Sequence, residues 1–107
     1  MIWFKDYRLD DLKSFRNTNM TAHLGFEFTE VGPDFLKGRL PVDNRTTQPF
    51  GILHGGASCV LAESLGSVAS WMTIDPDKYR AVGIEINANH IRAVTKGHVI
   101  GTCTPLH

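Results

Sequence analysis

The stretch from Thr46 to Ile74 contains no Lys, Arg or Asp, and its one acidic residue is Glu63. Within it, apolar residues recur at spacings of four and three, which predicts a helix of about five turns that ends before Pro76. The apolar stripe comprises Ala57, Leu61, Leu65, Val68 and Met72. A surface helix of this length usually carries several charges opposite its apolar stripe. We therefore expect a sheet to cover the stripe and another element to cover the opposite face.

The rest of the chain predicts shorter elements. A short helix is expected at 9–15, and alternation of apolar and polar residues at 26–31 and 35–42 predicts a β-hairpin around Gly32-Pro33-Asp34. A loop at 43–53 leads into the long helix, and two strands are expected after it, at 80–92 and 97–104. The predicted class is α+β, with residues 1–107 forming one domain.

Composition excludes several function classes. The 11 basic and 11 acidic residues cancel, which argues against nucleic-acid or anionic-membrane binding. The two cysteines, Cys59 and Cys103, form no CxxC pair, so neither a zinc site nor a disulfide framework is indicated. Residues 1–6 do not resemble a signal peptide, and no apolar run is long enough to span a membrane, so a cytoplasmic location is expected.

Glu63 is a candidate catalytic carboxylate. On a helix it projects away from the apolar stripe, among small residues that include Gly66, Ser67 and Ser70. A carboxylate in an enclosed place of this kind is a reasonable base, although it could instead form an ion pair or point into solvent. Ser67, four residues on, shares its face and could position a water or serve only as a small packing residue.

The segment His54-Gly55-Gly56 stands where the long helix begins. The first amides of a helix have no partner within it, and the helix dipole is positive at that end, so these glycine amides could form an oxyanion hole. The glycines could equally serve only a tight turn, and His54 could be a packed histidine.

Distance along the helix separates these two groups. Gly55 and Glu63 are eight residues apart, which is roughly 12 Å at the helical rise. A single reacting carbon cannot lie next to both within one chain. In a two-fold dimer with antiparallel helices, Gly55 of one chain would face Glu63 of the other, so we expect the active site to span two subunits.

The residues that carry a family resemblance are 48–58, QPFGILHGGAS, followed by 62–67, AESLGS. Further matches extend through 22–25, AHLG, and 87–92, NANHIR, to 105–107, PLH. With these motifs the chain resembles hotdog-fold acyl-CoA thioesterases of the phenylacetate and 4-hydroxybenzoyl-CoA type. It is most similar to the bacterial subgroup that hydrolyses 1,4-dihydroxy-2-naphthoyl-CoA or proofreads carrier-protein thioesters in siderophore assembly.

The resemblance implies roles for individual residues. Glu63 would be the nucleophile or general base, the Gly55 amide would polarise the thioester carbonyl, and Ser67 would hold the hydrolytic water. Gln48 and His54 would contact or orient the thioester. The substrate and CoA would be held by Val82, Asn89, His90, Ile91, Arg92, Leu106 and His107. The implied substrate is an acyl-CoA or acyl-carrier-protein thioester, the assembly is a homodimer or homotetramer, and neither a cofactor nor a metal is expected.

The chain departs from the family in its sheet. The resemblance implies an antiparallel sheet wrapped around a central helix, whereas here we expect the last two strands to be lacking, as in a C-terminally truncated domain. Unpaired strand edges and an open core are therefore expected. A hotdog dehydratase or hydratase and a non-catalytic acyl-CoA-binding or assembly module are the alternative functions. A metal site is not supported, since no HExxH or HxxxH spacing occurs.

Overall fold

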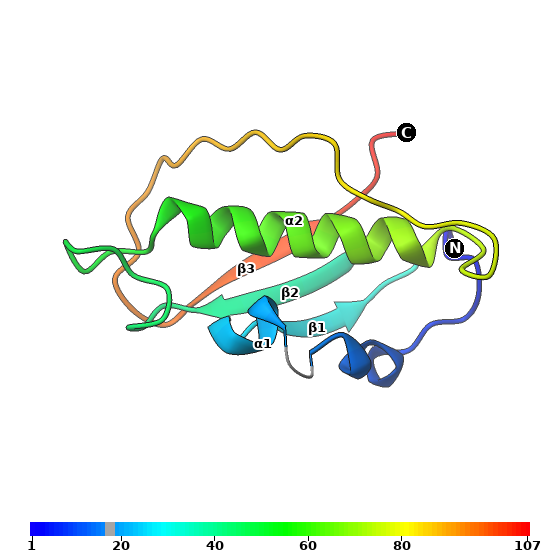
Figure 1. Ribbon diagram of the computed structural model, residues 1–107, viewed down its shortest axis with the longest axis horizontal. Helices are drawn as coiled ribbons and strands as arrows, with labels where there is room; N and C mark the ends of the chain where they lie inside the picture. The colour runs from blue at the N-terminus through cyan, green and yellow to red at the C-terminus, as the bar shows by residue number, and fades with distance from the viewer. Residues whose placement is uncertain (17–18) are drawn as a thin grey trace.

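The computed structural model describes residues 1–16 and 19–107 and has an α+β architecture, as predicted (Figure 1). Its two long elements are the helix α2, Gly55–Met72, and the sheet beneath it. The elements in chain order are the 3-10 helix η1 (Leu9–Arg16), α1 (Met20–Leu24), β1 (Glu27–Val31), β2 (Leu36–Pro41), α2 and β3 (His98–Cys103).

The sheet is antiparallel, with β2 in the middle of the order β1-β2-β3. Gly38 of β2 lies opposite Phe28 on one side and Gly101 on the other, which sets the register of all three strands. A register shift between Phe28 and Glu30 marks a bulge in β1. The predicted hairpin and the predicted strand at 97–104 are therefore confirmed.

The sheet packs against the apolar face of α2. Leu61, Leu65 and Met72 are buried there, together with Leu36 and Leu40 from β2. Gly101 of β3 allows the close approach, since a Cβ at that position would lie 2.6 Å from Cδ1 of Leu65. The predicted helix and its stripe are confirmed, with Val68 half-buried at the margin of the core.

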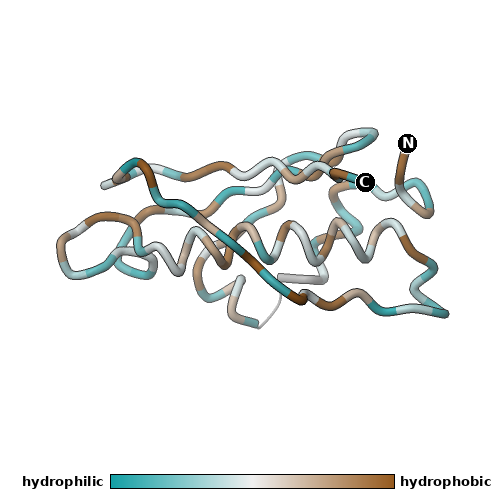
Figure 2. Tube along the Cα trace, turned by 90° about the horizontal axis from the view of Figure 1, so that it is seen from above, coloured by the Kyte–Doolittle hydropathy of each residue, from teal (hydrophilic) through white to brown (hydrophobic). Residues whose placement is uncertain are grey.

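The expected strand at 80–92 is not formed. Residues 80–96 run back along the face of α2 that is turned away from the sheet, so that α2 lies between this segment and the sheet (Figure 1). Seen from above, the segment crosses over α2 and alternates between apolar and polar residues (Figure 2). The alternation predicted a strand, but a strand also needs a neighbour for its backbone hydrogen bonds, and within residues 1–16 and 19–107 no ladder forms here. Its apolar side chains Val82, Ile84 and Ile91 are consequently exposed.

The helix α1 is absent from the sequence prediction. It is short and has capping residues at both ends: the Asn19 side chain accepts from the Ala22 amide at 3.3 Å, and Gly25 ends it with a φ of 78°. Its five residues are too few for a periodic signal, and caps of this kind stabilise a short helix. No helix in the described part of the chain is long and apolar enough to cross a membrane.

Candidate active site

The first turn of α2 presents a backbone amide that the described part of the chain leaves free. His54 is the N-cap, and its Nδ1 accepts a hydrogen bond from the Gly56 amide at 2.8 Å. The Ala57 amide donates to the His54 carbonyl at 2.9 Å. The Gly55 amide has no hydrogen-bond partner among the residues that the structure describes. The positive end of the helix thus directs an unused donor outward, in the place predicted for an oxyanion hole.

The His54 ring is fixed by the same capping bond. Because Nδ1 accepts from an amide, the proton of the neutral ring lies on Nε2, which remains a donor. His54 is exposed, so it is a capping residue at the surface and not a core histidine. Its own amide donates to the Thr46 carbonyl at 2.8 Å, which ties the helix start to the preceding loop.

Gln48 lies in that loop beside the helix start. The loop turns tightly, with the Gly51 amide donating to the Gln48 carbonyl at 2.8 Å and Gly51 in a left-handed conformation at φ 82°. The side-chain oxygen of Gln48 accepts from the Phe50 amide, which leaves the carboxamide NH2 group as a donor. Gln48 and Gly55 line one cavity of about 790 Å³.

Residues 89–92 line the same cavity. These four residues, Asn89, His90, Ile91 and Arg92, are all exposed. His90 lies closest to the helix start, since a Cβ at Gly55 would be 2.8 Å from its Nε2. The structure therefore brings the two predicted groups, Gln48 with His54-Gly55 and 89–92, to one end of α2.

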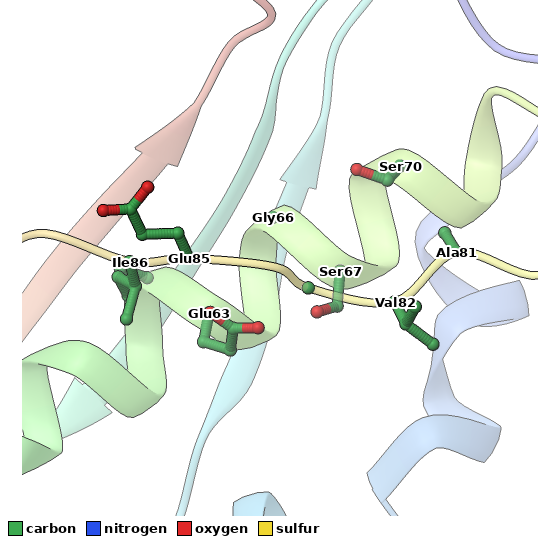
Figure 3. Close-up of a pocket in the computed structure, with 10 residues that line it drawn as sticks. Glu63, Gly66, Ser67, Ser70, Ala81, Val82, Glu85 and Ile86 are labelled. Carbon is green, nitrogen blue, oxygen red and sulfur yellow. The ribbon is translucent and has the colours of Figure 1, made fainter.

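Glu63 lies two turns further along the helix, in a separate cavity of about 260 Å³. Its carboxylate faces the crossing segment, and Ser67 follows one turn further along the helix (Figure 3). Val82 of the crossing segment lines the same cavity. The other residues of the wall include Gly66, Ser70, Ala81, Gly83, Glu85 and Ile86. We expected this face of the helix to be covered, but Glu63 is exposed, because the crossing segment covers it only on one side. Its carboxylate has no hydrogen bond or ion pair within residues 1–16 and 19–107.

Gly83 is a neighbour of Glu63 that sequence reasoning missed. A Cβ at position 83 would overlap Oε1 of Glu63 and lie 3.2 Å from its Cδ. A glycine inside a run of Val, Ile and Asn is a signal for close approach by another group, and this signal could have identified the position.

The last two predicted residues lie elsewhere. His107 lines a cavity of about 490 Å³ with Trp3, Ser70 and Cys103, towards the C-terminal end of α2, and Leu106 is fully exposed. Neither lines the cavity of Gln48 and Gly55. Burial raises the pKa of the nearby Cys103 thiol. Among residues 1–16 and 19–107, no group of three His, Cys, Asp or Glu side chains could hold a metal ion.

Comparison with known proteins identifies close relatives. Residues 50–107 match the model of the thioesterase superfamily. The chain is 49% identical over all its 107 residues to the 1,4-dihydroxy-2-naphthoyl-CoA hydrolase of Escherichia coli and covers 78% of that protein. A variant thioesterase from Pseudomonas aeruginosa superposes on the whole chain with a TM-score of 0.97 at 41% identity, with 77% of its own length covered. A thioesterase from Haemophilus influenzae superposes with a TM-score of 0.94 at 41% identity, and 74% of it is covered.

Proposed function

Because this chain belongs to the thioesterase superfamily, we propose that it hydrolyses aromatic acyl-CoA thioesters with Glu63 as the catalytic carboxylate and the Gly55 amide as the oxyanion donor. Membership establishes the hotdog fold and the enzyme class, a hydrolase of CoA thioesters. The roles of individual residues, the acyl group and the assembly are the proposed part.

The unused Gly55 amide is the observation that carries the proposal. Hydrolysis of a thioester places negative charge on the carbonyl oxygen, and a preorganised backbone N–H at a helix N-terminus stabilises that charge. Within residues 1–16 and 19–107 the Gly55 amide is free while its neighbour Gly56 is bonded to His54, so a donor is reserved for a ligand. The NH2 group of Gln48 on the same cavity can donate to the thioester carbonyl as well.

The Glu63 carboxylate reacts in one of two mechanisms, as a general base or as a nucleophile. As a general base it takes a proton from a water whose oxygen adds to the thioester carbon, and the tetrahedral oxyanion then collapses with loss of the CoA thiolate. As a nucleophile it adds to that carbon itself, expels the thiolate and leaves an anhydride, which water then hydrolyses. Ser67, one turn on from Glu63, can hold the water in both cases.

The two groups act together across a subunit interface. Gly55 and Glu63 belong to one regular helix, in which the helical rise separates them by roughly 12 Å. They line different cavities. A homodimer or homotetramer in which two α2 helices run antiparallel would join Gly55 of one subunit to Glu63 of its partner. The exposed Val82, Ile84 and Ile91 are apolar surface that such an assembly would cover.

We assign an aromatic acyl group, such as 1,4-dihydroxy-2-naphthoyl, on the strength of the Escherichia coli relative. A carrier-protein thioester has the same pantetheine arm and is the related alternative. Arg92 and His90 are exposed beside the Gly55 cavity, where a guanidinium can make charge-assisted bonds to CoA phosphates. Leu106 and His107 would reach CoA only in the assembly.

Thiol release from 1,4-dihydroxy-2-naphthoyl-CoA, benzoyl-CoA and a long aliphatic acyl-CoA tests the proposal, with the Glu63→Gln variant as the comparison. Gln keeps the shape of Glu but is not basic, so we expect kcat to fall by about 10² to 10⁴. Size-exclusion chromatography and thermal unfolding would show that the variant still folds and assembles.

Two outcomes would count against the proposed function. Equal kcat values in the wild type and Glu63→Gln would remove Glu63 from the mechanism. Tight binding of acyl-CoA by a folded wild-type oligomer that releases no thiol would favour a binding module instead.

A further inference from the structure

Gly83 lies directly beside the carboxylate of Glu63. Its segment, which also carries Val82 and Glu85, crosses over α2 (Figure 3). The space that a side chain at position 83 would fill is occupied by Oε1 of Glu63. The two residues come from different parts of the chain, and only the crossing of 80–96 over α2 brings them together.

The backbone at Gly83 does not itself require glycine. Positive φ values occur at Gly25, Gly51 and Gly97, where an L-residue would be strained, but Gly83 has no such conformation. At Gly101 a Cβ would meet Leu65 in the core, which is a packing requirement. At Gly83 the three atoms nearest to an added Cβ are Oε1, Cδ and Oε2 of Glu63. The feature that requires a glycine at position 83 is therefore the nearby carboxylate, and not a turn or the packing of the core.

A methyl group at position 83 would move Glu63 and little else. The carboxylate is the far end of a flexible side chain, it is exposed, and within residues 1–16 and 19–107 no hydrogen bond or ion pair holds it. A rotation of Glu63 relieves the overlap without a shift of the helix. The fold should tolerate the change, while the carboxylate leaves its place beside Ser67.

We propose that Gly83 is a positioning residue that gives the Glu63 carboxylate the space it needs for catalysis. The inference rests on the proposed role of Glu63. With no hydrogen bond from the described residues to orient it, the carboxylate takes its direction from the shape of its surroundings, and a bare backbone at position 83 forms one wall. A misplacement of about 1 Å can cost on the order of 10²-fold in rate, so this wall affects kcat more than substrate binding.

The Gly83→Ala variant tests the inference. We expect kcat to fall by about 10- to 100-fold, with KM within about twofold of the wild type and an unchanged unfolding temperature. Glu63→Asp provides the matched background, since its side chain is one methylene shorter and does not reach the space at position 83. In that background the added methyl group should change kcat by less than about threefold, so the two substitutions are strongly coupled.

Each alternative result would overturn the inference. An unchanged kcat in Gly83→Ala would show that Gly83 does not act through Glu63. The same would follow if Gly83→Ala lowered kcat by the same factor in the wild type and in the Glu63→Asp variant. A raised KM at constant kcat would assign Gly83 to binding, and a lowered unfolding temperature would assign it to the fold. If Glu63→Gln kept full activity, the proposed function itself would fail. If Glu63→Gln were slow while Gly83→Ala kept full activity, the proposed function would stand and only the positioning role of Gly83 would be refuted.

Discussion

Replacing Gly55 by proline removes the proposed oxyanion donor without removing the helix. Proline has no N–H, and Gly55 is the first residue of α2, where proline is well accommodated. The residue before a proline must be extended, and His54 already is, with φ −67° and ψ 131°. We therefore expect Gly55→Pro to fold like the wild type.

The expected loss of kcat in Gly55→Pro is that of removing one hydrogen-bond donor. One backbone amide of an oxyanion hole contributes about 10² to 10³ in kcat, or about 2.7–4 kcal/mol of transition-state stabilisation. Gly55→Ala is the matched control, because it keeps the N–H and meets the same His90 ring, whose Nε2 would lie 2.8 Å from the new Cβ. His90 is exposed and can turn away, so the control should lose far less activity.

The assay is steady-state thiol release from an aromatic acyl-CoA, with thermal unfolding measured on the same samples. Equal kcat values for Gly55→Pro and Gly55→Ala would refute the reasoning, since the two variants differ in the amide donor. An equal and large loss in both would point to the His90 contact instead.

The same variant tests whether the site is shared between subunits. The Gly55→Pro and Glu63→Ala variants are unfolded together and refolded, so that mixed dimers form. In a mixed dimer one of the two sites combines Gly55 of the Glu63→Ala subunit with Glu63 of the Gly55→Pro subunit, and both of these groups are intact. Random mixing makes half the dimers mixed, so about a quarter of wild-type activity should return. No recovery from mixed dimers verified by mass would place both groups in one subunit.

Two further predictions concern stability. Leu65→Ala should lower the free energy of unfolding by about 2–5 kcal/mol in urea titrations, because Leu65 is 3% exposed and packs on Gly101; a loss below about 1 kcal/mol would contradict this packing. Hydrogen bonds from Arg45, the shortest at 2.7 Å from Nη2 to Oδ2, hold the pKa of the Asp43 carboxyl below its ordinary value of 3.8. Their stabilisation is therefore present above that ordinary value and is lost as the pH falls through the lowered pKa. Arg45→Ala should raise the pKa of Asp43 in an NMR titration, and an unchanged value would refute the assignment.

The sequence predicted those features that depend on neighbours along the chain. The apolar spacing of Leu61, Leu65 and Met72 was sufficient to predict α2, and turn residues between alternating segments were sufficient to predict the β1–β2 hairpin. The helix also placed Gly55 and Glu63 eight residues apart, since a regular helix converts sequence separation directly into distance. The candidate donor, the candidate carboxylate and their separation therefore follow from the amino-acid sequence alone.

The prediction of a strand at 80–92 was wrong. The alternation of apolar and polar residues is typical of a strand, but a strand also requires a second backbone, which local sequence does not encode. The short helix α1 was missed for a related reason, because its formation depends on the Asn19 and Gly25 caps and not on periodicity.

Tertiary structure alone decided which residues meet at the site. It brought Gln48 and His90 to the cavity that Gly55 lines, set Gly83 against Glu63, and left His107 at the other end of α2. These contacts join residues from separate loops and elements, and their distances depend on how the 80–96 segment passes over α2. The sequence by itself determined the chemical groups on the helix, because helical geometry is local. The packing of the rest of the chain determined what surrounds each group, because contacts between distant residues depend on the whole fold.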